Sequence, residues 1–205
     1  MLRLTRHPSL RVASPVAARR VVAHGATAVA IAALTVAATR APVGAQVLTQ
    51  DEALELAFPG DEVERRTAYL TDDQLARATE EAGPDVEVET GIVTYYVAIR
   101  GDRPVGVAYF DVHRVRTVTE VLMIVVDPND RIRRVETIRF SEPPKYQAPD
   151  GWLRQFDGQG LDEELSLKGE IANITGATLT AGAVTRSTRR ALALHHVIAP
   201  FGETP

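Results

Sequence analysis

Three threonines and a glycine stand together in residues 175–180, Thr-Gly-Ala-Thr-Leu-Thr, directly before a helix-like run over residues 181–197. Gly176 lets the backbone bend into conformations that are closed to other residues. Thr180 is a suitable N-cap for the helix, and the free amides and dipole of the first turn favour a nearby anion. Thr178 could then hydrogen-bond a phosphate or carry one as an ester. The segment predicts a phosphate site, although capping alone explains the same residue types.

Several common chemistries find no support in the sequence. The chain has no cysteine, which excludes disulfides, thiolate nucleophiles, Cys-ligated zinc and iron–sulfur clusters. The common hydrolase and NTPase motifs (Gly-x-Ser-x-Gly, His-Glu-x-x-His and Walker) are absent. His195 and His196 are neighbours in the expected helix and point in different directions. We therefore expect them to interact with the helix C-terminus and predict no metal site.

The sequence before residue 90 predicts a helical lead-in, over about residues 46–88. Thr49 is a hydroxyl cap followed by an acid three residues later, and its helix should run to about Phe58, before a Pro-Gly pair. Thr71 opens a second helix that should end at about Ala82, before a Gly-Pro pair. Between the two, charged side chains indicate a solvated helix face: Glu62, Glu64, Arg65 and Arg66.

The middle of the chain predicts four strands in an antiparallel meander. Residues that favour strands are enriched in four runs separated by short turns: residues 91–99, 104–112, 118–126 and 132–140. The turn over residues 127–130, Asp-Pro-Asn-Asp, has proline at its second position. The third run is apolar on both faces from Val121 to Val126, so we expect this strand to be covered on both sides.

Two further helices complete the expected fold. A short one over residues 151–156 carries the only tryptophan, and the last one covers residues 181–197. At helical spacing one face of the last helix carries Val184, Thr188, Ala191, Leu192 and His195. Arg186, Arg189 and Arg190 lie mostly off that face. We therefore predict an α+β fold, an antiparallel sheet meander with N-terminal helices and a C-terminal helix that follows the Thr-Gly-Ala-Thr turn.

Residues 1–45 have the features of a secretory signal peptide. They hold six arginines and no acid, an uncharged run over residues 21–38, and small side chains at Val43 and Ala45 that suit cleavage after Ala45. An uncleaved anchor is less favoured, because the run is Ala-rich and barely long enough to span a membrane. No repeat or low-complexity linker divides residues 46–205, so we expect one domain there, outside the cytoplasm.

The charge of the expected mature chain limits its partners. Residues 46–205 contain 17 basic and 27 acidic residues. This balance argues against a nucleic-acid partner, because contacts to phosphates need a basic face. It suits a carrier that docks on a basic partner.

The motif at residues 175–180 resembles the Ser/Thr-Gly-Ala-Thr-x-Thr motif of the FMN-binding domain family. That family includes the C subunit of the sodium-translocating quinone reductase and the G subunit of the Rnf complex. Further features follow in a similar order over residues 90–197. They are a sheet segment, the pair Glu142-Pro143, an aromatic segment over residues 152–158, the threonine motif and a closing helix.

The resemblance implies an FMN that a flavin transferase attaches through its phosphate to Thr178. Such a phosphodiester leaves the isoalloxazine ring free for electron transfer, while the protein orients the ring and tunes its potential. The other cofactor-binding residues implied are Thr175, Gly176, Ala177, Leu179, Thr180 and Glu142. The resemblance also implies an exported redox carrier or oxidoreductase subunit, periplasmic or at the extracytoplasmic face of the inner membrane. Its partner in use would be a membrane or soluble redox protein.

One position departs from the family pattern. The family has an aspartate three positions before the first Ser/Thr of the motif, whereas this chain has Ala172 there, with Asn173 beside it. That aspartate belongs to the pattern associated with flavin transfer. Three functions therefore stay open: an electron carrier with covalent FMN on Thr178, a small reductase with non-covalent FMN, and a binding or scaffold domain that has lost flavinylation.

Other residues have two interpretations each. His113 could pass protons to a reduced flavin, and Arg114 and Arg116 could contact a phosphate, but residues 111–117 also suit a solvated loop. Glu142 could shape the flavin pocket or simply mark a turn. Four aromatic side chains could stack on the flavin ring or belong to the core: Tyr95, Tyr96, Tyr109 and Trp152.

Overall fold

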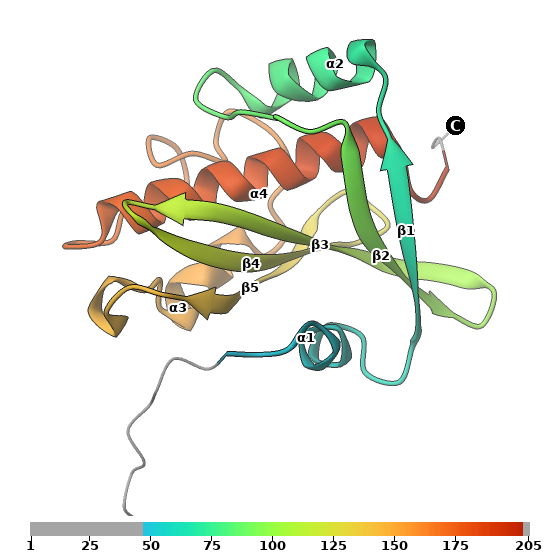
Figure 1. The fold of residues 1–205 in the computed structure, drawn as a ribbon, viewed down its shortest axis with the longest axis horizontal. Coiled ribbons are helices and arrows are strands. Elements are labelled where there is room, and N and C mark those ends of the chain that lie inside the picture. Colours follow the sequence, from blue (N-terminus) through green and yellow to red (C-terminus); the bar gives the residue numbers. More distant parts are fainter. Residues whose placement is uncertain (1–46, 203–205) are drawn as a thin grey trace, which may run out of the picture. The chain divides into compact units, whose positions relative to one another are not determined.

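The computed structural model describes residues 47–202, which form the α+β fold that the sequence predicts. Four α-helices are present in this range: α1 (Gln50–Ala57), α2 (Asp72–Ala82), α3 (Asp150–Leu153) and α4 (Thr178–Ile198). The strands are β1 (Glu62–Tyr69), β2 (Ile92–Arg100), β3 (Arg103–Val115), β4 (Val118–Val126) and β5 (Ile132–Phe140). Two 3-10 turns, η1 (Pro144–Tyr146) and η2 (Arg154–Phe156), flank α3 (Figure 1).

The sheet is an antiparallel meander of five strands in the order β1-β2-β3-β4-β5. The four predicted strands are confirmed, and β1 corrects the expected helix face over residues 62–66. This segment pairs with β2 along its whole length. The ion pair between Glu64 and Arg66 joins neighbours on one strand face. Charged side chains of this kind are common on edge strands, where they discourage pairing with other chains.

The first two helices begin at the predicted caps. The Thr49 hydroxyl accepts a hydrogen bond from the Glu52 amide while the Glu52 carboxylate accepts from the Thr49 amide. Thr71 and Gln74 form the same reciprocal pair at the start of α2. Both capping boxes satisfy amides that a helix start otherwise leaves without partners.

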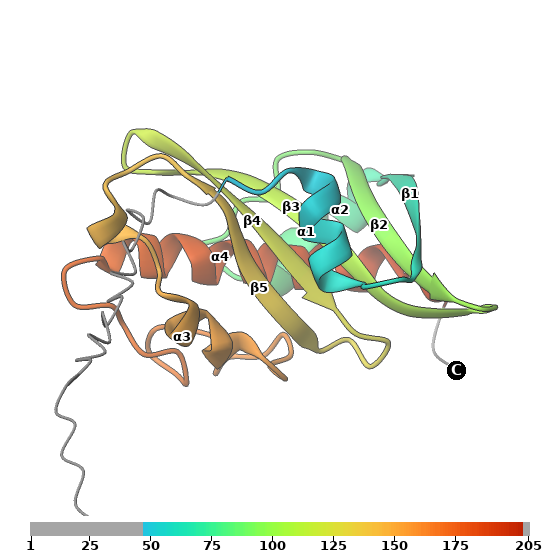
Figure 2. The same ribbon diagram turned by 90° about the horizontal axis from the view of Figure 1, so that it is seen from below.

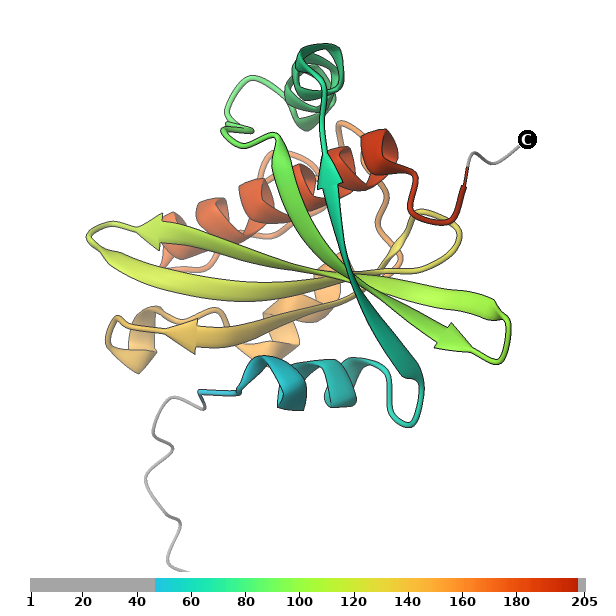
Figure 3. The ribbon, with the colours of Figure 1, turned by 45° about the vertical axis from the view of Figure 1, so that its right-hand side comes forward.

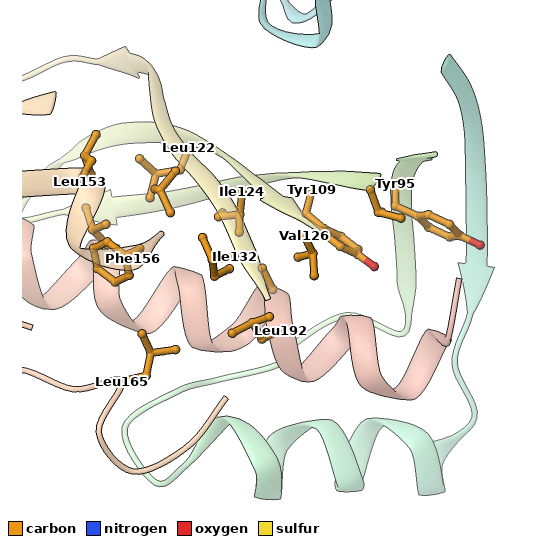
Figure 4. Close-up of a cluster of buried hydrophobic side chains, with 14 of the residues drawn as sticks. Tyr95, Tyr109, Leu122, Ile124, Val126, Ile132, Leu153, Phe156, Leu165 and Leu192 are labelled. Atoms are coloured by element: carbon orange, nitrogen blue, oxygen red, sulfur yellow. The ribbon is translucent and has the colours of Figure 1, made fainter. Parts of the chain in front are cut away.

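The helices cover the sheet in layers (Figure 2). α1 packs on one face, against alternate residues of β2, β3, β4 and β5. α4 lies against the other face, where Leu192 packs among sheet side chains and Phe156 and Leu165 extend the same cluster (Figure 4). α2 packs on the side of α4, through small residues that include Ala78 and Ala193. β4 is therefore covered on both faces, as its apolar sequence predicts.

The described helices include none that is both long and apolar enough to cross a membrane. The predicted signal peptide, residues 1–45, lies outside the described residues. Its cleavage and the extracytoplasmic location remain predictions.

Candidate functional site

The threonine motif forms a turn and the first residues of α4. Gly176 has a φ of 83°, a conformation that favours glycine, and the space where a Cβ would lie is open. The helix begins at Thr178 with Ala177 as its N-cap, three residues earlier than predicted, and no side chain caps it. Its first backbone bond joins the Ala181 amide to the Ala177 carbonyl. The amides of the residues before Ala181 are therefore free of intrahelical acceptors.

Thr180 is not the N-cap that the sequence predicts. Its side chain is buried, and its hydroxyl donates a hydrogen bond of 2.7 Å to the carbonyl of Tyr146 in η1. Thr180 therefore ties the start of α4 to the segment that follows β5. Thr178 and Leu179, by contrast, are exposed, Leu179 by 60%. The hydroxyl that is open to a ligand is that of Thr178.

A cavity of about 290 Å³ lies beside this helix start. It brings together Glu142 and most of the motif. Val115, Arg116 and Tyr146 complete it. The sequence indicated Arg116 as one possible phosphate contact, but nothing in it grouped Val115 or Tyr146 with the motif. The lining residues are Val115, Arg116, Glu142, Tyr146, Gly176, Ala177, Thr178, Leu179 and Thr180. Thr175 lies in the adjoining turn and does not line the cavity.

The charges around the cavity suit a phosphate monoester or diester. Arg116 occupies the turn between β3 and β4, with its guanidinium carbon 5.8 Å from the centre of the Tyr146 ring. The Lys145 ammonium lies 4.8 Å from the same ring. Arg116 thus lines the cavity at the end of α4 where the free amides and the positive end of the helix dipole already favour an anion, and Lys145 lies against the Tyr146 ring that lines the same cavity. Glu142 is the one carboxylate among the residues that line the cavity.

The chain that leads into the motif is braced by the short helices. The Trp152 indole N–H donates a hydrogen bond to the carbonyl of Ala172, and the Ala172 amide donates to the Gln155 side-chain oxygen at 2.9 Å. Asn173 accepts a hydrogen bond from the amide of Ile174 through its own side chain. Trp152 therefore positions the segment before the motif, and its ring packs edge-on against Phe156. Ala172 and Asn173 are exposed.

The three tyrosines considered for flavin stacking lie in the core. Tyr95, Tyr96 and Tyr109 are each less than a tenth exposed and pack on the two faces of the sheet. The Tyr109 hydroxyl lies 2.9 Å from Nδ1 of His195, and Asp130 lies 3.0 Å from Nε2. Burial raises the pKa of Tyr109 well above its usual value and lowers the pKa of His195 to about 4. The Tyr109 hydroxyl therefore donates to a neutral imidazole, which donates in turn to Asp130.

His113 belongs to a buried polar cluster and not to a solvated loop. Residues 111–115 continue β3, which turns Asp111 and His113 toward α4. His113 contacts Asp111 through Nδ1 and Glu120 through Nε2, both at 2.9 Å, and the Ser187 hydroxyl lies 3.0 Å from Nδ1. Arg190 reaches both carboxylate oxygens of Asp111. The alternation of polar residues at 111, 113 and 120 in a strand pair was the sequence feature that could have revealed this cluster.

The cluster favours the charged form of His113. Burial lowers the pKa of His113, but the hydrogen bonds and charges of Asp111 and Glu120 outweigh this effect and raise the pKa overall. Burial likewise raises the pKa of Asp111, and its contacts with His113, Arg190 and Ser187 lower the pKa overall. Glu120 is fully buried, and its Oε1 has no hydrogen-bond partner within residues 47–202. No group of three or more His, Cys, Asp or Glu side chains in this range is arranged so that it could hold a metal ion.

The fold and the site together define a class: an α+β domain with a cavity at the exposed start of its C-terminal helix, lined by residues that suit a phosphate-bearing ligand. Residues 118–193 match the model of the FMN-binding domain family, from the start of β4 into α4. This match confirms the resemblance drawn from the motif and supports FMN as the cofactor. No curated protein matches the chain.

Proposed function

We propose that this protein is an exported electron carrier that holds FMN through a phosphodiester to Thr178. One arrangement carries the proposal: an exposed Thr178 hydroxyl at an uncapped helix start, inside a domain that matches the FMN-binding family. The residues of the cavity suit the cofactor, because the free amides and Arg116 complement a phosphate. When bound, FMN would supply the redox chemistry.

The chain's own residues would bind and orient the cofactor. The α4 amides and Arg116 would hold the phosphate, and Gly176 leaves open space beside it. The exposed Leu179 would offer an apolar surface to the flavin. Glu142, which follows β5, would form another part of the cavity wall. The braces from Trp152 and Gln155 to Ala172 would keep the motif in place as the flavin changes charge.

The partners and the location are part of the proposal. A flavin transferase would load Thr178, and a membrane or soluble redox protein would exchange electrons with the carrier. The basic, uncharged and small-residue segments of residues 1–45 support export to the periplasm or the extracytoplasmic face of the inner membrane. If the segment is cleaved as expected, the exported protein begins at Gln46, which N-terminal sequencing would show.

The mass of the exported protein tests the flavin link. Co-expression with a flavin transferase should add the mass of one FMN less water, and peptide mapping should place it on Thr178. Thr178→Val should lose the added mass and keep its circular dichroism spectrum, because the side chain is exposed at a helix start. Thr119→Val, an exposed threonine on β4, is the matched control and should keep the flavin. A covalent flavin on Thr178→Val would refute the assignment.

Ala172 gives the alternatives a specific test. It is exposed and held only through its backbone, so Ala172→Asp restores the family residue without a packing penalty. If the natural chain gains no mass while Ala172→Asp does, the scaffold alternative is favoured for the natural protein. A yellow protein that releases its flavin on acid denaturation would instead support a reductase with non-covalent FMN.

A further inference from the structure

The sheet splits beside β3. β2 pairs with β3 only from Arg100 to Tyr95, whereas β4 follows β3 to Val115. The first residues of β2, from Ile92 to Thr94, pair with β1 and not with β3. Figure 3 shows the β3–β4 hairpin leaning away from β2, with α4 crossing behind the opening. Residues 110–115 of β3 therefore have a free hydrogen-bonding edge, since β4 is the one described strand that pairs with them.

A cavity of about 750 Å³ occupies this opening. The facing edges of β2 and β3 form two of its sides, Arg190 and Leu194 of α4 line it, and Glu87, Glu89 and Thr90 complete it. The lining residues from the strands are Ile92, Val93, Thr94, Phe110, Asp111, Val112, His113, Arg114 and Thr119. At about 3.3 Å per residue, the free edge of β3 is roughly 20 Å long, enough for a strand of about six residues.

The opening is flanked by exposed apolar side chains. Val112 is 67% exposed and Ile92 is 59% exposed, on the two facing strands. Tyr69, which pairs with Ile92 across β1 and β2, is 76% exposed. These are three of the six large apolar residues that are exposed in the described chain. An unpaired edge with apolar side chains is the feature by which sheets accept an added strand.

One side of the opening is acidic. Glu87 and Glu89 are exposed and line the cavity, and the buried Val86 and Val88 anchor this segment to the core. Neither glutamate forms an ion pair with any residue in the described range. Arg190 donates a hydrogen bond to the Glu87 carbonyl, but its charge is paired with Asp111. Basic side chains on a bound strand would meet these free carboxylates.

We propose that the opening between β2 and β3 receives an extended, basic segment of a partner protein, which adds a strand to the free edge of β3. Apolar side chains of that segment would pack on Val112 and Ile92, and basic ones would face Glu87 and Glu89. A second copy of this chain is a poorer occupant. With 17 basic and 27 acidic residues in residues 46–205, two copies repel one another.

The free edge of β3 leads to the cavity in which we propose that the flavin binds. β3 ends at Val115, and Val115 and Arg116 line the cavity beside Thr178. A strand bound along residues 110–115 would therefore place its protein next to the proposed cofactor. The docking itself needs no flavin, so it can be tested on protein that carries none.

A short peptide tests the docking site. The probe is the acetylated, amidated hexapeptide Lys-Val-Lys-Val-Lys-Val, with Glu-Val-Glu-Val-Glu-Val as its acidic counterpart. We expect the basic peptide to bind and to slow amide hydrogen exchange at alternate positions within residues 110–115, measured by NMR. The acidic peptide should bind at least about tenfold more weakly, because it meets Glu87 and Glu89. Equal binding of both peptides, or protection elsewhere, would overturn the proposal.

Two variants localise the interaction. Val112→Lys should weaken binding of the basic peptide by about tenfold, since it replaces an apolar contact by a like charge, and edge strands tolerate lysine. The double variant Glu87→Lys, Glu89→Lys should reverse the peptide preference. Leu56→Lys on α1, which is 46% exposed and lies outside the cavity, should leave binding unchanged. Concentration-dependent dimerisation that protects residues 110–115 without peptide would overturn the partner assignment in favour of a second copy.

Discussion

Thr178 and Thr180 lie two residues apart at the start of α4 and have different surroundings. Thr178 is exposed beside the cavity, whereas Thr180 is 1% exposed and donates to the Tyr146 carbonyl. About half a turn of helix therefore separates a hydroxyl that is available for chemistry from one that holds the site together. Both are threonines at a helix start, so residue type alone does not distinguish their roles.

Replacing Thr180 should cost stability. Thr180→Val keeps the shape of the side chain but leaves the Tyr146 carbonyl without its donor, so the free energy of unfolding should fall by about 1 kcal/mol. Urea denaturation measures this, with an unchanged m-value. Thr119→Val, which is exposed and removes no side-chain hydrogen bond recorded in residues 47–202, should change stability little. Equal losses in the two variants would contradict a structural role for the Thr180 hydroxyl.

α4 carries much of the polar order of the molecule. Its polar side chains bond to three segments: Thr180 to η1, Ser187 and Arg190 to β3, and His195 to the turn after β4. Arg189 reaches past the helix to the carbonyls of Ala82, Asp162 and Leu165. The predicted apolar face is buried as expected. The three arginines predicted to lie off that face differ in their exposure and contacts. Arg186 is exposed, while Arg189 and Arg190 link α4 to its neighbours.

Arg189→Ala should therefore destabilise the fold. It removes the donor to three backbone carbonyls, and part-buried groups of this kind cost about 1–3 kcal/mol when left unpaired. We expect a loss of about 2–3 kcal/mol in urea denaturation. Arg186→Ala on the same helix is the matched control, because an exposed substitution usually changes stability by no more than about 0.5 kcal/mol. Comparable stability of the two variants would show that the Arg189 contacts are not formed.

At the scale of the whole molecule, two buried histidines make the free energy of unfolding depend on pH in opposite directions. The pKa of His195 is lowered to about 4, so between about pH 4 and 6.5 the unfolded chain binds a proton that the folded chain does not. Stability from this group is lost as the pH falls through that window. The pKa of His113 is raised, so its contribution is complete below about pH 6.5 and is lost as the pH rises through the folded-state value.

Matched variants separate the two effects. The difference in unfolding free energy between the natural chain and His195→Gln should shrink by up to about 3 kcal/mol as the pH falls from 7 to 4, at about 1.4 kcal/mol per pKa unit. The difference for His113→Gln should instead shrink as the pH rises above about 6.5. Urea denaturation at several pH values measures both, and a pH-independent difference for either variant would contradict the corresponding assignment.

The fold was largely readable from the sequence because local patterns encode local structure. Capping residues located the starts of α1 and α2, and runs of strand-favouring residues between short turns located β2 to β5. β1 was missed because its charged residues are typical of exposed segments of either kind, and pairing with β2 decides its conformation. The motif before α4 located one wall of the site and pointed to the FMN-binding family, since its residues are contiguous.

The tertiary structure decided what distant segments do together. The turn after β3 brings Val115 and Arg116 to the motif, and no spacing in the sequence relates residues more than 50 positions apart. Burial of His113 and of Thr180 depends on α4 and η1 packing against them. The free edge of β3 exists because β2 turns away to pair with β1. Hydrogen bonding and burial are properties of the packed chain, so these features follow only from its three-dimensional arrangement.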